Sequence, residues 1–152
     1  MPRKNKTRSK NKASSSLTGK SERTLKILWA NSYCLLDTSS GASISVRQIL
    51  IELSKRGYQV EIVGATIFDS SKGIERLSQT WDLIQEADTP VVNITDDQLL
   101  HRLVKTKDTF RPNMTLEEAT NVYNLYVSVL DDFKPDLVFY YGGGPMDYHF
   151  PS

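Results

Sequence analysis

The chain has 152 residues, enough for one domain of ordinary size, and its 19 Lys/Arg against 18 Asp/Glu give a formal charge of +1. A single cysteine, Cys34, excludes an internal disulfide framework and suits a reducing compartment. No apolar run is long enough to span a bilayer, and none follows the basic N-terminal segment as in a secretory signal, so we expect a cytoplasmic protein.

Residues 1–24 differ in composition from the rest of the chain. They hold eight basic residues and one acidic residue, which leaves residues 25–152 with a net charge of −6. With only Met1 and Leu17 as large apolar residues, the segment cannot offset the entropy of ordering, and we predict a disordered basic tail. The alternative is contact with anionic lipid at the inner face of the membrane. Nucleic acid is disfavoured because the tail has no aromatic residue for base stacking.

The domain opens with a pattern typical of a β-α-β unit. Residues 25–31 are a short apolar run rich in strand formers, followed by a loop without periodicity. Apolar residues then recur at helical spacing, which predicts a helix that begins near Ala42 or Ser43 and ends before Gly57; its buried stripe is Ala42, Val46, Ile49, Leu50 and Leu53. Residues 60–63 are the second strand, closed by Gly64, and the pair is expected to be parallel.

The second half continues to alternate helices and strands. Residues 74–84 carry a second helical stripe (Ile74, Leu77, Trp81 and Ile84), and residues 90–94 form a third strand. Residues 95–98 resemble a capping box that opens a short helix through about Val104, and residues 105–112 are a polar loop.

The final predicted helix has the stronger start signal. Thr115 and Glu118 form a capping box, and Pro135 ends the helix. Its expected buried side is Leu116, Ala119, Tyr123, Tyr126, Val127, Leu130 and Phe133. Residues 137–141 follow as the fourth strand, with the composition of a strand covered on both faces.

This order of elements predicts the fold class. Strands that alternate with helices through short connections indicate a Rossmann-like three-layer α/β/α domain with a parallel sheet. We expect the strand order 3-2-1-4 and a sheet that is incomplete at its C-terminal end.

The Ser/Gly-rich loop at residues 38–45 is the first candidate site. Backbone N–H groups at the start of the following helix are unpaired, and the helix dipole favours an anionic ligand there. Gly41 leaves room for a ligand beside the backbone, and Ser39, Ser40, Ser43 and Ser45 offer hydroxyl donors. The alternative is a self-capped turn without a ligand. The loop lacks the glycines and lysine of a dinucleotide or Walker motif.

A second glycine loop follows the fourth strand at Gly142, Gly143 and Gly144. In the order 3-2-1-4 the first and fourth strands flank the point where strand order reverses, so both glycine loops are expected to face one cleft. The alternative is a flexible turn. Asp37 and Asp69 lie in loops on the same rim, either as groups that bind sugar hydroxyls or act as a base, or as solvated carboxylates.

Other chemistry finds little support in the sequence. Cys34 follows a buried strand and is expected to be a small hydrophobe rather than a nucleophile. No metal-ligand spacing and no acid/base pair is visible, so we name no metal site, no cofactor and no catalytic residue.

The segments at residues 26–30, 42–53, 55–63 and 134–139 resemble the N-terminal domain of a GT-B glycosyltransferase of the glycosyl transferase 4-like group. The resemblance covers residues 25–145, and a donor-binding domain is absent from this sequence. It implies a domain that holds the saccharide or lipid-linked acceptor of a nucleotide-sugar-dependent enzyme and is inactive alone.

Site roles carried over from the family follow the same resemblance. Ser40 and Gly41 would approach the donor diphosphate, with Ser40 where the family often has a glycine. Asp37, Asp69 and Gly142–Gly144 would line the acceptor side. Two other function classes stay open: a stand-alone flavodoxin-like module that binds a small anion or nucleotide, and an interaction protein with an acidic body and a basic tail.

Overall fold

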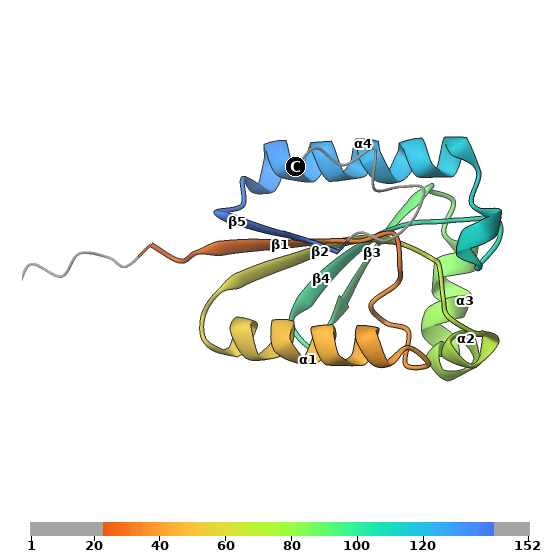
Figure 1. Cartoon of the computed structure of the whole chain (residues 1–152), viewed down its shortest axis with the longest axis horizontal. Helices are drawn as coiled ribbons and strands as arrows, with labels where there is room; N and C mark the ends of the chain where they lie inside the picture. Colours follow the sequence, from red (N-terminus) through yellow and green to blue (C-terminus); the bar gives the residue numbers. More distant parts are fainter. Residues whose placement is uncertain (1–22, 142–152) are drawn as a thin grey trace, which may run out of the picture.

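The computed structural model describes residues 23–141, except the side chain of Arg111, as a sheet between two layers of helices (Figure 1). The strands are β1 (Lys26–Ala30), β2 (Gln59–Ala65), β3 (Val91–Asp96), β4 (Leu99–Val104) and β5 (Leu137–Tyr140). The helices are α1 (Gly41–Lys55), α2 (Ser71–Leu77), α3 (Gln79–Glu86), α4 (Leu116–Phe133) and a 3-10 turn, η1 (Arg111–Asn113). Helix α4 covers one face of the sheet, and α1, α2 and α3 lie on the other.

The sheet confirms the predicted Rossmann-like α/β class. Its five strands lie in the order β3-β4-β2-β1-β5. β4, β2, β1 and β5 are parallel, and β3 runs antiparallel to β4 at one edge. The four strands expected from the sequence keep their relative order as β3, β2, β1 and β5, and one unexpected strand, β4, is inserted between the first two.

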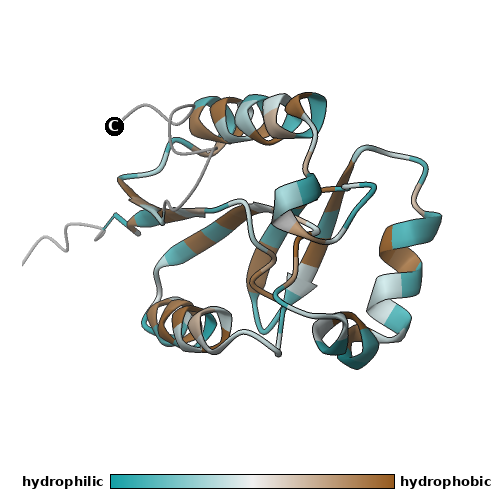
Figure 2. Ribbon diagram, turned by 45° about the vertical axis from the view of Figure 1, so that its right-hand side comes forward, coloured by the Kyte–Doolittle hydropathy of each residue, from teal (hydrophilic) through white to brown (hydrophobic). Residues whose placement is uncertain are grey.

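Strand β1 divides the core between the two faces. Leu28 and Ala30 pack in a cluster with Val122 of α4, whereas Ile27 points to the opposite face and packs with Leu50 of α1. Because successive strand residues point to opposite faces, one five-residue strand contributes to both layers. Figure 2 shows hydrophobic residues concentrated on the strands and alternating with hydrophilic residues along the helices.

The predicted helix at residues 95–104 is wrong, because these residues form the end of β3, the turn and β4 of a β-hairpin. Asp97 and Gln98 have φ of 45° and 69°, the left-handed backbone of a two-residue hairpin turn. Leu99, His101 and Leu103 are each 0 % exposed on one face of β4. This alternation with a period of two is the signal of a strand.

The predicted helix at residues 74–84 is broken in two. Ser78, with φ of 38°, separates α2 from α3. The predicted stripe of Ile74, Leu77, Trp81 and Ile84 nevertheless packs in one cluster beneath the sheet. The apolar spacing was therefore informative about burial and not about continuity of the helix.

Helix α1 begins at Gly41 and is rotated relative to its predicted stripe. Leu50 is buried as expected, but Ile49 is 61 % exposed and Ile51 is buried instead. The reason is the position of α1, which contacts β2 and β4. The side of the helix with Ile51 therefore faces the sheet, and the side with Ile49 faces away from it.

Strand β5 forms the sheet edge of the described part of the chain, where it pairs with β1. Its side chains are exposed, including Leu137 at 47 % and Phe139 at 42 %. The expectation that this strand is covered on both faces is therefore not met within residues 23–141.

The capping box of α4 is present as predicted. The Thr115 side chain accepts a hydrogen bond from the Glu118 N–H, and the Glu118 carboxylate accepts one from the Thr115 N–H at 2.8 Å. The buried face of α4 differs in part from the prediction, since Leu116 is 75 % exposed while Val122 and Val129 are buried.

His101 is a buried polar residue in β4, between β3 and β2. Both ring nitrogens are buried and have no hydrogen-bond partner among the described residues. Burial lowers the pKa of His101 from 6.5 to about 4, nearby Asp96 opposes this shift, and Arg47 adds to it. The neutral imidazole is therefore the form compatible with the fold.

We expect the free energy of unfolding to fall by up to about 3 kcal/mol as the pH falls from about 6.5 to 4, because the unfolded chain protonates His101 and the folded chain does not. His101→Phe and His101→Gln both remove this part of the pH dependence, and only the Phe variant gains stability at pH 7. Urea unfolding between pH 4 and pH 8 measures both effects. If the unfolding free energy of both variants depended on pH as in the wild type, the neutral buried state of His101 would be contradicted.

The hairpin turn gives a second prediction. Gln98→Gly is expected to stabilise the chain by about 0.5–1 kcal/mol, because glycine adopts positive φ without strain. Gln59→Gly, at an exposed β2 position with ordinary φ, is the matched control and is expected to destabilise. Equal effects of the two substitutions in urea unfolding would argue against a strained turn.

Candidate functional site

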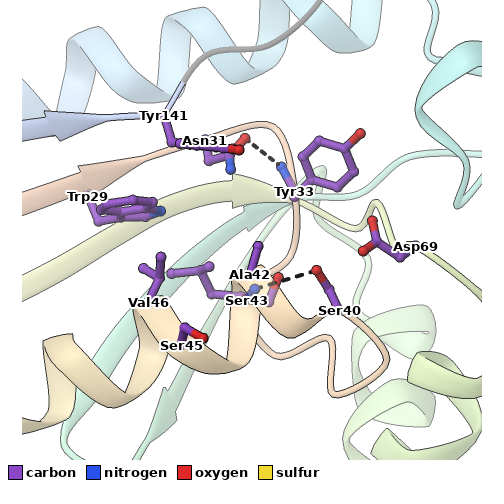
Figure 3. A pocket seen from close by; sticks show the side chains of 11 residues that line it. Trp29, Asn31, Tyr33, Ser40, Ala42, Ser43, Ser45, Val46, Asp69 and Tyr141 are labelled. Atoms are coloured by element: carbon purple, nitrogen blue, oxygen red, sulfur yellow. Dashed lines mark hydrogen bonds between the residues drawn. The ribbon is translucent and has the colours of Figure 1, made fainter.

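A pocket of about 410 Å³ lies where β1 and β5 end (Figure 3). β1 leads to β2 on one side of the sheet and has β5 as its neighbour on the other, so the pocket lies at the point where strand order reverses. Its lining residues are Trp29, Asn31, Tyr33, Leu35, Ser40, Ala42, Ser43, Ser45, Val46, Asp69 and Tyr141.

The segment between β1 and α1 is held against the continuation of β2. The Asn31 N–H donates to the Val63 carbonyl at 3.0 Å, and the Cys34 N–H donates to the Ile67 carbonyl at 2.9 Å. A Cβ at Gly64 would lie 2.7 Å from the Tyr33 carbonyl oxygen. Glycine at position 64 therefore lets the chain that forms the pocket floor lie directly on β2.

Helix α1 directs its first turn at the pocket. Ser40 is the N-cap, and its Oγ accepts a hydrogen bond from the Ser43 N–H at 3.4 Å, as in the predicted self-capped turn. The first intrahelical bond runs from the Ile44 N–H to the Ser40 carbonyl. The N–H groups of Gly41 and Ala42 precede this bond and are the positive end of the helix dipole.

The serine hydroxyls are less available than the sequence suggests. The hydroxyl of Ser39 donates to Asp37, that of Ser43 to the Cys34 carbonyl, and that of Ser45 to the Gly41 carbonyl. Of the four expected donors, Ser40 alone has no internal acceptor for its hydroxyl in the described part of the chain.

Asn31 and Trp29 add donors that were not expected from the sequence. The Asn31 Oδ1 accepts a hydrogen bond from the Tyr33 N–H at 3.2 Å, which leaves the amide NH₂ directed into the pocket (Figure 3). Asn31 is 6 % exposed, and the Trp29 Nε1 is buried without a hydrogen-bond partner within residues 23–141. A polar residue directly after an apolar strand was the available signal for Asn31.

Aromatic residues form the wall beside β5. The rings of Trp29 and Tyr141 stack at 6.4 Å with an angle of 16° between their planes, and Phe139 lies 6.5 Å from Trp29. The Tyr141 N–H donates to the Ala30 carbonyl, which holds this residue beside β1. The pocket therefore combines a flat apolar wall with polar groups from α1 and the loops, an arrangement suited to a ring-shaped polar ligand.

The structure brings some of the predicted site residues together and not others. Ser40 and Asp69 both line the pocket. Gly41 occupies the first position of α1 and is exposed; it is not among the lining residues but lies between two of them, Ser40 and Ala42. Gly142–Gly144 lie outside the described residues, directly after Tyr141, so their role as acceptor-side residues stays a prediction.

Asp37 does not line the pocket, in contrast to the expectation. It is 2 % exposed, and its Oδ1 accepts from the N–H and Oγ–H of Ser39 at 2.8 and 2.6 Å. Its Oδ2 accepts from the Asp69 N–H at 2.7 Å. Because both oxygens are used by the protein, direct contact of Asp37 with a ligand is not supported.

Cys34 is a buried core residue, as predicted. It is 0 % exposed, and burial raises the pKa of its thiol to about 12. The thiol therefore stays protonated at neutral pH and does not supply a nucleophile.

Comparisons with known proteins assign no family. No family model matches the sequence, and neither a curated protein nor a solved structure gives a significant match.

Two glycines near the site provide a matched pair. A Cβ at Gly73 would lie 2.1 Å from the Asp37 Oδ1, whereas a Cβ at Gly41 meets nothing within 4 Å. We expect Gly73→Ala to destabilise the chain by about 1–3 kcal/mol through overpacking, and Gly41→Ala to be neutral or stabilising. Thermal unfolding of both variants tests this, and destabilisation by Gly41→Ala would contradict the described helix start.

Proposed function

We propose that the chain is the acceptor-side N-terminal domain of a GT-B glycosyltransferase that transfers a sugar from a nucleotide-diphosphate sugar to a saccharide or lipid-linked acceptor. The observation that carries the proposal is the pocket at the carboxyl ends of β1 and β5. There the first turn of α1, the loop after β2 and an aromatic wall meet. The sequence resemblance at residues 25–145 supports the same choice.

The lining groups suit the two parts of such a reaction. An aromatic wall of Trp29 and Tyr141 fits the apolar face of a sugar ring, while Asp69 and the Asn31 amide provide an acceptor and a donor for hydroxyl groups. The first turn of α1, with Ser40 and Gly41, would face the donor diphosphate and stabilise the negative charge that develops on it.

In this proposal the nucleotide is recognised by a second domain, and the present domain alone is inactive. The exposed apolar residues of β5 would be one surface for contact with that domain. No catalytic residue is assigned.

A cytoplasmic location is part of the proposal. Among the helices of residues 23–141, none has both the length and the apolar character needed to cross a membrane. The basic segment at residues 1–24 is proposed to contact anionic lipid, which would bring the domain close to a lipid-linked acceptor.

A second candidate is a stand-alone module that binds a small anion or nucleotide. It is favoured by one observation: the Asn31 amide and the start of α1 both direct N–H donors at the pocket within this chain. The two candidates differ in the ligand that binds to the isolated chain.

Calorimetric titration with maltotriose, UDP-glucose and UDP separates the candidates. We expect maltotriose to bind and to change the fluorescence of Trp29 in a Trp81→Phe background. Replacing Trp29 by Leu is expected to weaken binding about tenfold, a loss of about 1.4 kcal/mol. Trp81→Leu, which removes a core aromatic away from the pocket, is the control. Tight binding of UDP without binding of the saccharide would instead favour the second candidate.

A further inference from the structure

We infer that Asp37 is a positioning residue that fixes the two loops of the pocket relative to each other without touching the ligand. The inference rests on the proposed function only in requiring that the pocket binds a ligand. Asp37 lies in the loop after β1, and its carboxylate is enclosed by protein at 2 % exposure.

One carboxylate joins two walls of the pocket. Through Oδ1, Asp37 accepts both hydrogen bonds of Ser39, the residue before the α1 N-cap Ser40. Through Oδ2, it accepts the N–H of Asp69 from the loop after β2. Since Ser40 and Asp69 line the pocket, this carboxylate is the side-chain link that fixes their separation, beside the backbone bond from the Cys34 N–H to the Ile67 carbonyl.

Helix α2 encloses the carboxylate from a third side. Gly73 of α2 leaves no room for a side chain, because its Cβ would lie 2.1 Å from the Asp37 Oδ1 and 2.9 Å from the Asp37 Cγ. Arg76 of the same helix donates to the Thr38 carbonyl at 2.9 Å. The carboxylate is therefore confined between the loop it belongs to, the loop after β2 and α2.

The chemistry of the interaction makes Asp37→Asn informative. Both oxygens of Asp37 accept hydrogen bonds, and an amide of the same shape replaces one acceptor by a donor. One of the two loops must then lose its bond and face an N–H donor instead. The side-chain volume stays the same, so the contact with Gly73 is preserved.

Glu118 provides a matched control away from the pocket. It is 7 % exposed and accepts hydrogen bonds from the Lys107 N–H, the Thr115 N–H and the Thr115 Oγ–H. Glu118→Gln therefore removes the same kind of buried acceptor from another loop-to-helix junction. It is not among the residues that line the pocket.

The experiment compares both variants in the full chain with Trp81→Phe, at a temperature where circular dichroism shows both folded. The probe is maltotriose, titrated by calorimetry. We expect Asp37→Asn to weaken binding at least tenfold and Glu118→Gln to change it less than twofold, with similar losses in melting temperature. Equal weakening in both variants would overturn the inference, because it would reduce Asp37 to a general contributor to stability.

A ligand-independent readout separates this inference from the proposed function. If the wild-type chain does not bind maltotriose, the proposed function fails, and acrylamide quenching of Trp29 decides the role of Asp37. At least a twofold rise in quenching for Asp37→Asn alone supports positioning, and unchanged quenching overturns it. If Asp37→Asn does not fold, Ser39→Ala takes its place, since it removes one of the three donors. For Ser39→Ala we expect a threefold change in the same readouts. Readouts that stay unchanged would overturn the inference.

Discussion

Parallel pairing of β1 on both of its sides is the constraint from which the site follows. β1 is hydrogen-bonded to β2 and to β5, with Leu28 opposite Glu61 on one side and Val138 on the other. Because all three strands point the same way, their carboxyl ends lie at one edge of the sheet. The start of α1, the loop after β2 and Tyr141 are therefore neighbours although they are far apart in the sequence.

The sequence predicted the class and most elements because those depend on local patterns. The strand runs, the capping box at Thr115 and the apolar stripe from Ile74 to Ile84 each reflect spacing that folding preserves. Residues 95–98 wrongly predicted the start of a helix, because a capping box and a hairpin turn use the same polar residues. The positive φ of Asp97 and Gln98 decides between them and leaves no mark in this sequence.

The rest depended on tertiary position. Which flank of α1 is buried follows from its placement over β2 and β4, so periodicity alone could not distinguish Ile49 from Ile51. Likewise Asp37 and Asp69 looked equivalent as loop carboxylates. Only the fold turns Asp37 inward as an acceptor for both loops and leaves Asp69 at the pocket. Asn31 gained its place in the site from the bond between its Oδ1 and the Tyr33 N–H.

The proposed site holds its ligand at the carboxyl ends of β1 and β5, between α1 and the aromatic wall. Two-dimensional NMR of the isotope-labelled chain titrated with maltotriose tests it most directly. Binding in this pocket is expected to shift only the Trp29 indole N–H, the Asn31 side-chain amide and the backbone amides of Gly41 and Asp69. Shifts centred instead on the surface groove at Gln48, Asp97 and Gln98, or no shifts at saturating saccharide, would contradict it.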